Sequence, residues 1–119
     1  MNTLQVLTRE QADPKVQGIF DDLKAEIGMV PNLYAVIGNS ANALESFLAY
    51  SSAQAQGSFS AKEREAVSLA VSEVNGCTYC LAAHTAIAKM NGFTEEETLQ
   101  LRAGVSGDMK LRALTRLAI

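Results

Sequence analysis

Both cysteines and the single histidine of this chain lie within residues 77–84. If residues 77–91 form one helix, with about 100° between successive residues, Cys77, Cys80 and His84 share one stripe of its surface. Both thiols then face the same way as the imidazole. A redox-active dithiol needs this arrangement, because two sulfurs must come close enough to form a disulfide beside a base that can pass a proton.

The two cysteines differ in their expected surroundings. Cys77 follows Gly76 at the start of the helix, where unpaired N–H groups and the helix dipole favour a thiolate. Cys80 lies one turn deeper and can touch His84, four residues further on. The dipole therefore favours Cys77 as the nucleophile, whereas contact with the histidine favours Cys80. The sequence leaves both alternatives open.

The same residue types also fit interpretations other than dithiol chemistry. The cysteines could be buried small side chains, and His84 could be a hydrogen-bonded core histidine. Zinc could be held by Cys77, Cys80, His84 and a carboxylate, but structural zinc sites usually draw ligands from two separated segments and the chain has no second pair. We therefore expect dithiol chemistry with no metal and no other cofactor.

Three acids on the preceding segment could assist the histidine. Glu63 already has a role as the acid of a helix-capping box, and Glu73, near a helix end, is expected to be solvated. Glu65 lies on the same helix side as Leu69, so it could be drawn inward, where a carboxylate needs a partner such as His84. Spacing alone does not select it.

Length and composition predict one soluble domain over residues 1–119. The N-terminus lacks the features of a secretory signal, and no stretch is long enough to cross a bilayer, so we expect a cytoplasmic protein with no membrane partner. In a reducing compartment, a C-x-x-C pair is more often catalytic or metal-binding than structural. The chemistry expected of Cys77 and Cys80 fits that compartment.

The charge pattern argues against nucleic acid as a partner. Net charge is −3, and basic residues gather only at Lys110, Arg112 and Arg116. Charged residues make up 19% of the chain and apolar residues 48%, against a usual charged share of about 25%. This surplus of apolar side chains suggests burial between subunits.

Helix caps and apolar spacing predict an all-α bundle of six or seven helices. The expected segments are 13–28, a short one at 31–39, 40–57, 60–76, 77–92, 94–104 and one from 108 onward. The segment 60–76 is apolar on most sides and is expected to be central. Only residues 104–108 suggest a flexible connector. The last predicted helix stops without a cap. Two explanations stay open: the chain is a fragment, or this helix completes its packing against another subunit.

Residues 60–85, with a glutamate twelve positions before Cys-x-x-Cys-x-x-x-His, resemble the alkyl hydroperoxidase D (AhpD)-like branch of the carboxymuconolactone decarboxylase superfamily. The resemblance covers about residues 40–104, and its motif is specific. It selects Glu65 over its neighbours. It also implies an AhpD-like helical bundle assembled as trimers or hexamers, with active sites close to subunit contacts.

The resemblance further implies an antioxidant peroxidase that reduces hydroperoxides through a dithiol/disulfide cycle with a Glu–His proton relay. In the best-known members the second cysteine, here Cys80, attacks the peroxide, and the first, here Cys77, resolves it. A dithiol donor, in those members a lipoyl protein, then reduces the disulfide. The expected catalytic residues are Cys80, Cys77, His84 and Glu65.

One position departs from the best-known peroxidase, which has a relay histidine just before its second cysteine where this chain has Tyr79. On an ideal helix Tyr79 points away from the stripe, so we expect packing there. Decarboxylase members lack the cysteine pair, which disfavours lactone chemistry. Two alternatives stay open: a non-enzymatic redox-responsive or assembly protein, and a general disulfide oxidoreductase.

Overall fold

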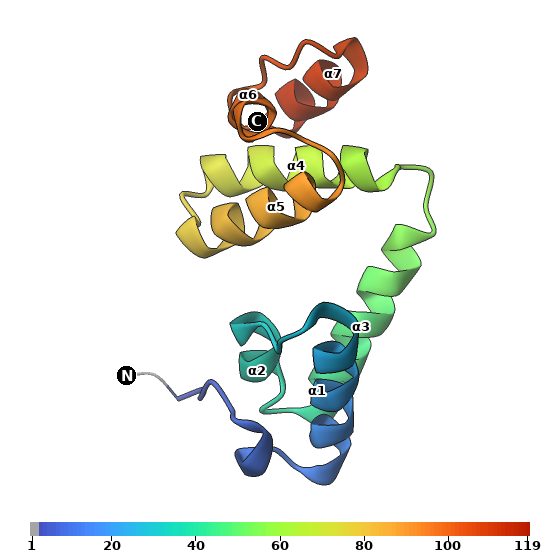
Figure 1. Ribbon diagram of the computed structural model, residues 1–119, viewed down its shortest axis with the longest axis vertical. Coiled ribbons are helices and arrows are strands. Elements are labelled where there is room, and N and C mark those ends of the chain that lie inside the picture. Colours follow the sequence, from blue (N-terminus) through green and yellow to red (C-terminus); the bar gives the residue numbers. More distant parts are fainter. Residues whose placement is uncertain (1–2) are drawn as a thin grey trace. The chain divides into compact units, whose positions relative to one another are not determined.

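The computed structural model describes residues 3–119 and contains helices without any strand over that range (Figure 1). The elements are a 3-10 turn η1 (Arg9–Gln11) and helices α1 (Pro14–Ile27), α2 (Asn32–Ile37), α3 (Ala41–Ala55), α4 (Ala61–Val74), α5 (Thr78–Met90), α6 (Glu95–Ala103) and α7 (Met109–Ala118). The predicted all-α class is confirmed. None of the described helices is both long and apolar enough to cross a membrane.

The chain forms two compact units, residues 1–54 and 55–119. The N-terminal unit holds η1, α1, α2 and most of α3, and the C-terminal unit holds α4 to α7. That residues 1–119 act as one domain stays a prediction. All four predicted site residues belong to the C-terminal unit, which therefore contains both the Cys77–Cys80 disulfide and the Glu65–His84 contact.

In the N-terminal unit, α1 begins and ends where its sequence predicts. The Asp13 carboxylate accepts hydrogen bonds from the backbone N–H groups of Lys15 and Val16, and Gly28 closes the helix with a left-handed φ of 82°. The core of this unit joins α1, α2 and α3 through the buried residues Ala12, Val16, Phe20, Ala35 and Leu44. The N-terminal unit therefore has an apolar core of its own.

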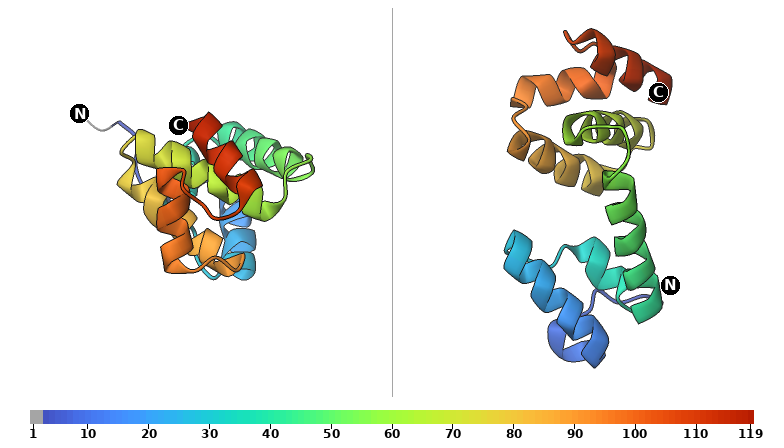
Figure 2. Two further views of the ribbon diagram at one scale, coloured as in Figure 1. Left: turned by 90° about the horizontal axis from the view of Figure 1, so that it is seen from above. Right: turned by 90° about the vertical axis from the view of Figure 1, so that its right-hand side faces the viewer.

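In the C-terminal unit, α4 is the central helix, as predicted. It packs against α5, α6 and α7, and Figure 2 shows the same helices from two further sides. The core cluster comprises Ala66 and Leu69 of α4, Ala88 of α5, Phe93, and Leu101 of α6. Because α4 contacts three helices, its packing sets where the side chains of α5, α6 and α7 lie.

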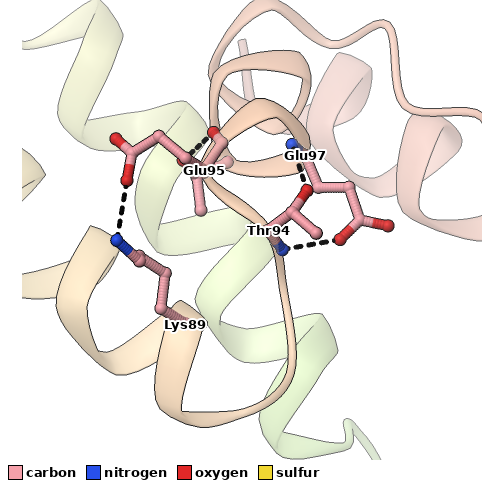
Figure 3. A network of polar contacts seen from close by, with 5 residues as sticks. Lys89, Thr94, Glu95 and Glu97 are labelled. Atoms are coloured by element: carbon pink, nitrogen blue, oxygen red, sulfur yellow. Dashed lines mark hydrogen bonds and ion pairs between the residues drawn. The ribbon is translucent and has the colours of Figure 1, made fainter.

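Both predicted capping boxes are present. The Ser60 hydroxyl accepts from the Glu63 N–H while the Glu63 carboxylate accepts from the Ser60 N–H, and Thr94 and Glu97 do the same at the start of α6 (Figure 3). Beside the second box, Lys89 at the end of α5 pairs with Glu95 at 2.9 Å. The junction between α5 and α6 is thus held by local hydrogen bonds and one ion pair.

Residues 104–108 are not a free connector. The Gly104 carbonyl accepts from Arg116 Nε at 3.1 Å, and the Ser106 carbonyl accepts from Arg112 at 3.4 Å. Ser106 is buried, and Asp108 caps α7 by accepting from the Leu111 N–H. The turn is therefore fastened by side chains of the helix that follows, which the composition of residues 104–108 alone did not reveal.

Truncating Leu69 tests the central packing of α4. Leu69 is fully buried, and Leu69→Ala is expected to lower the free energy of unfolding by roughly 2–5 kcal/mol, because it leaves a cavity between α4 and its neighbours. Leu99→Ala is the matched control, since Leu99 is 50% exposed. Urea unfolding followed by circular dichroism measures both. Equal costs for the two variants would contradict the assigned core.

Glu63 gives stability a pH dependence. The Lys110 ammonium, and then the Ser60 N–H, hold the pKa of this carboxyl below its usual 4.5. A lowered folded-state pKa stabilises the fold above the unfolded-state value, and this contribution is lost as pH falls through the lowered pKa. Glu63→Gln keeps the capping geometry but carries no charge. We expect its free energy of unfolding to be lower than that of the wild type at neutral pH and to equal the wild-type value in acid.

Denaturant unfolding at a series of pH values measures this difference. Lys110→Met removes the same ion pair, whose Nζ and Oε1 lie 2.6 Å apart, and should reproduce part of the effect. The difference in unfolding free energy between wild type and Glu63→Gln should disappear once the Glu63 carboxyl is protonated. If it persisted unchanged in acid, the charge of Glu63 would not be its cause.

Candidate active site

A tight turn brings α5 back along α4. Gly76 has a left-handed φ of 61°, which a residue without a Cβ adopts at low cost. The Gly76 N–H donates to the Glu73 carbonyl, and the Cys77 N–H donates to the Ser72 carbonyl at 3.1 Å. These bonds fasten the first cysteine to the last turn of α4, so the start of α5 is fixed relative to that helix.

Cys77 and Cys80 form a disulfide, with their Cα atoms 5.2 Å apart. Cys77 lies just outside α5, as its N-cap residue, and not within the helix as the predicted stripe had it. Its sulfur accepts a hydrogen bond from the Cys80 N–H at 3.2 Å, the bond that a serine or aspartate oxygen makes at other helix starts. Both cysteines are partly exposed.

Glu65 and His84 form the second pair of the site. The Glu65 Oε2 atom, in the middle of α4, lies 2.7 Å from His84 Nδ1, in the middle of α5. The side chains are 14% and 32% exposed. A carboxylate at this distance accepts from Nδ1–H and leaves Nε2 as the nitrogen that can exchange a proton. Nε2 makes no hydrogen bond to any of residues 3–119.

Of the three candidate acids, Glu65 is the one that contacts the histidine. Glu63 pairs with Lys110, and Glu73 pairs with Arg102 Nε at 2.6 Å. The expectation that Glu73 is merely solvated is wrong, because α6 brings an arginine to it. The structure thus joins two of the predicted residues by hydrogen bond and the other two by disulfide, and the two pairs lie about one turn apart along α5. Their catalytic roles stay predictions.

Sequence reasoning missed Arg102 as a partner of Glu73. A hollow of about 230 Å³ lies over this ion pair, lined by Glu73, Leu99, Arg102 and Ala103. None of the four site residues lines it. No signal in the sequence pairs residue 73 with residue 102, because the pairing depends on how α6 lies against α4.

Two further observations complete the site. Tyr79 is 45% exposed in the first turn of α5. Among residues 3–119, no three histidine, cysteine, aspartate or glutamate side chains come together in a form that could hold a metal ion. The groups that the site brings together are the two sulfurs and the carboxylate–imidazole pair.

An all-α fold with a cysteine pair at a helix start and a carboxylate–histidine pair on the same helix defines a helical protein with a Cys-x-x-Cys disulfide site. The chain belongs to the carboxymuconolactone decarboxylase family, whose family model matches residues 40–118.

Among solved structures, the chain is similar to the alkylhydroperoxidase AhpD core from Rhodospirillum rubrum. The two are 28% identical with a TM-score of 0.73, over 98% of this chain and 88% of that one. The comparison with curated proteins gives no match. The family match and the fold confirm the prediction that this chain is an AhpD-like member of the carboxymuconolactone decarboxylase superfamily.

Proposed function

We propose that this protein is a thiol-dependent peroxidase that reduces organic hydroperoxides and serves in antioxidant defence. The observation that carries the proposal is the Cys77–Cys80 disulfide placed one helical turn from the Glu65–His84 pair. Similarity to an alkylhydroperoxidase core supports the same activity. The cysteine pair argues against lactone decarboxylation, because that reaction has no use for a disulfide.

In the proposed cycle, His84 Nε2 takes the proton of the Cys80 thiol, directly or through a water, while Glu65 holds Nδ1–H and stabilises the imidazolium. The Cys80 thiolate attacks the terminal peroxide oxygen, the O–O bond breaks, and an alcohol leaves with the returned proton. Cys80 is now a sulfenic acid. The Cys77 thiol gives up its proton and its sulfur attacks Cys80 Sγ, the S–O bond breaks, the departing hydroxide takes that proton and leaves as water, and the disulfide forms.

Two electrons from a dithiol donor then restore both thiols by exchange through a mixed disulfide. A lipoyl protein is the expected physiological donor, in the cytoplasm. Every step uses sulfur and proton chemistry that these four residues can supply, so the proposal needs no metal, flavin or haem.

We also propose that the protein works as a homo-oligomer, a trimer or hexamer. Tyr79, Ile87 and Met90 of α5 are 45%, 40% and 83% exposed, so one side of the cysteine-bearing helix presents apolar side chains to its surroundings. Exposed apolar surface of this kind is typical of a contact between subunits. Sedimentation velocity over a range of protein concentrations measures the state.

The decisive experiment mixes fully reduced, metal-free protein with one equivalent of cumene hydroperoxide and follows the intact mass and free-thiol count over seconds to minutes. We expect both thiols to disappear together, with the mass falling by two hydrogens, and dihydrolipoamide to restore them. Oxidation of these thiols at a rate no higher than that of free cysteine would contradict the proposal.

The exposed apolar side of α5 also favours a second candidate, a redox-responsive assembly protein in which the disulfide alters a helical interface. This candidate predicts slow oxidation, no turnover, and a change of sedimentation coefficient between the oxidised and reduced forms. Turnover with peroxide and an unchanged oligomeric state would exclude it.

A further inference from the structure

The two sulfurs of the disulfide are held differently. Cys77 Sγ accepts the Cys80 N–H at the start of α5, where the helix dipole also favours negative charge. A thiolate formed at Cys77 keeps this hydrogen bond without further rearrangement. Cys80, within the first turn, lies about one turn from His84, whose Nε2 has no hydrogen bond to the described residues.

These surroundings bear on which sulfur an incoming thiol attacks. In thiol–disulfide exchange the sulfur whose thiolate is better stabilised departs faster. Both cysteines are partly exposed, so burial does not choose between them. The N-cap hydrogen bond makes Cys77 the better leaving group. The i, i+4 spacing on α5 places His84, a proton acceptor, one helical turn from Cys80.

We infer that the donor thiol attacks Cys80 and expels Cys77 as a thiolate, and that His84 takes the proton of the attacking thiol. The histidine then acts twice in one cycle, first on the Cys80 thiol and later on the donor thiol. The inference rests on the proposed function, because it describes the reductive half of that cycle.

The atoms and electrons balance as follows. The first donor thiol gives its proton to His84 Nε2 and its sulfur bonds to Cys80 Sγ, while the Cys77–Cys80 bond breaks and its electron pair leaves on Cys77. The second donor thiol, losing its proton to water, attacks its own first sulfur. A cyclic disulfide departs, and Cys80 takes the proton from His84. The donor is oxidised by two electrons and the protein disulfide is reduced.

This order also explains why the donor should be a dithiol. The expelled Cys77 thiolate stays at the helix start, beside Cys80, and can re-form the protein disulfide by attacking the mixed disulfide. A monothiol donor must wait for a second molecule, whereas a dithiol closes on itself. We therefore expect dithiols that form small rings to reduce the protein far faster than monothiols at equal thiol concentration.

The site of attack can be mapped on the wild-type protein. Protein oxidised with diamide, without peroxide, is mixed with 2-mercaptoethanol and alkylated with N-ethylmaleimide after increasing short times. Tryptic fragment 65–89 carries both cysteines, and tandem mass spectrometry assigns each label. We expect mercaptoethanol on Cys80 and maleimide on Cys77. Mercaptoethanol on Cys77, on both in similar amounts, or on neither would overturn the inference.

The role of His84 is tested by reduction rates at two pH values. At pH 6.5, where little of the probe thiol is ionised, His84→Gln should slow reduction by 2-mercaptoethanol about a hundredfold, the lower part of the range for a positioned general base. At pH 9.5 much of the thiol is ionised, so the two rates should approach each other.

The matched control is Lys89→Gln on the same helix, which removes the ion pair with Glu95 and should leave both rates unchanged. A rate loss in His84→Gln that is equal at both pH values would indicate a structural role and overturn the assignment. Since the disulfide is made with diamide, a failure here is distinguishable from a failure of peroxide reduction, which is measured on the reduced protein.

Discussion

We expect replacement of Cys80 with serine to abolish hydroperoxide turnover, and replacement of Cys77 with serine to leave one oxidation per chain and no turnover with a dithiol. In the proposed cycle Cys80 supplies the thiolate that attacks the peroxide, and Cys77 only converts the resulting sulfenic acid into a disulfide. We expect the rate of Cys80→Ser to fall by about a thousandfold or more, as when the nucleophile of other enzymes is removed.

Stopped-flow consumption of cumene hydroperoxide, with dimedone trapping and intact mass, measures both variants. Cys77→Ser should gain one dimedone adduct on residue 80. The N-cap hydrogen bond to Cys77 Sγ makes the reversed assignment a clear alternative. If Cys80→Ser gained the adduct and Cys77→Ser did not react, the two cysteines would exchange roles in the oxidative half of the cycle.

We expect Glu65→Gln to slow oxidation of Cys80 by about a hundredfold, because a glutamine keeps the shape of the side chain but carries no charge to stabilise the His84 imidazolium. The carboxylate lies 2.7 Å from Nδ1 and is largely shielded from solvent. A glutamine oxygen can still accept the Nδ1–H bond, so we expect the fold to persist and circular dichroism to be unchanged. Single-turnover thiol oxidation measures the effect.

Glu73→Gln is the matched control, since it makes the same chemical change on the same helix. Glu73 pairs with Arg102 and not with the histidine, so this variant should oxidise at the wild-type rate. Equal loss in the two variants would mean that net charge near the site, and not the Glu65–His84 contact, sets the rate.

The ends of the helices were predictable because the signals that make them lie within a few residues. At four helix starts a side chain accepts a hydrogen bond from an N–H group of the first turn. These caps are Asp13, the Ser60–Glu63 box, the Thr94–Glu97 box and Asp108. Such bonds depend on local backbone geometry alone. The separation of Cys80 and His84 along α5 is local as well, because it follows from the helical period.

The partners across helices were not predictable in the same way. Glu63, Glu65 and Glu73 all lie on α4 and are alike in sequence, yet one meets Lys110 of α7, one meets His84 of α5 and one meets Arg102 of α6. Resemblance to a family selected Glu65, whereas spacing did not. Each pairing depends on the rotation and tilt of a helix against α4, which the packed core sets.

The sequence by itself determined an all-helical chain with two thiols and an imidazole within residues 77–84, because caps, apolar spacing and a C-x-x-C-x-x-x-H run act over short distances. Only the tertiary structure decided that Glu65, among the acids of α4, is the one that meets His84. That contact follows from the turn at Gly76 and the packing of α5 on α4, which bring together residues that are far apart in the chain.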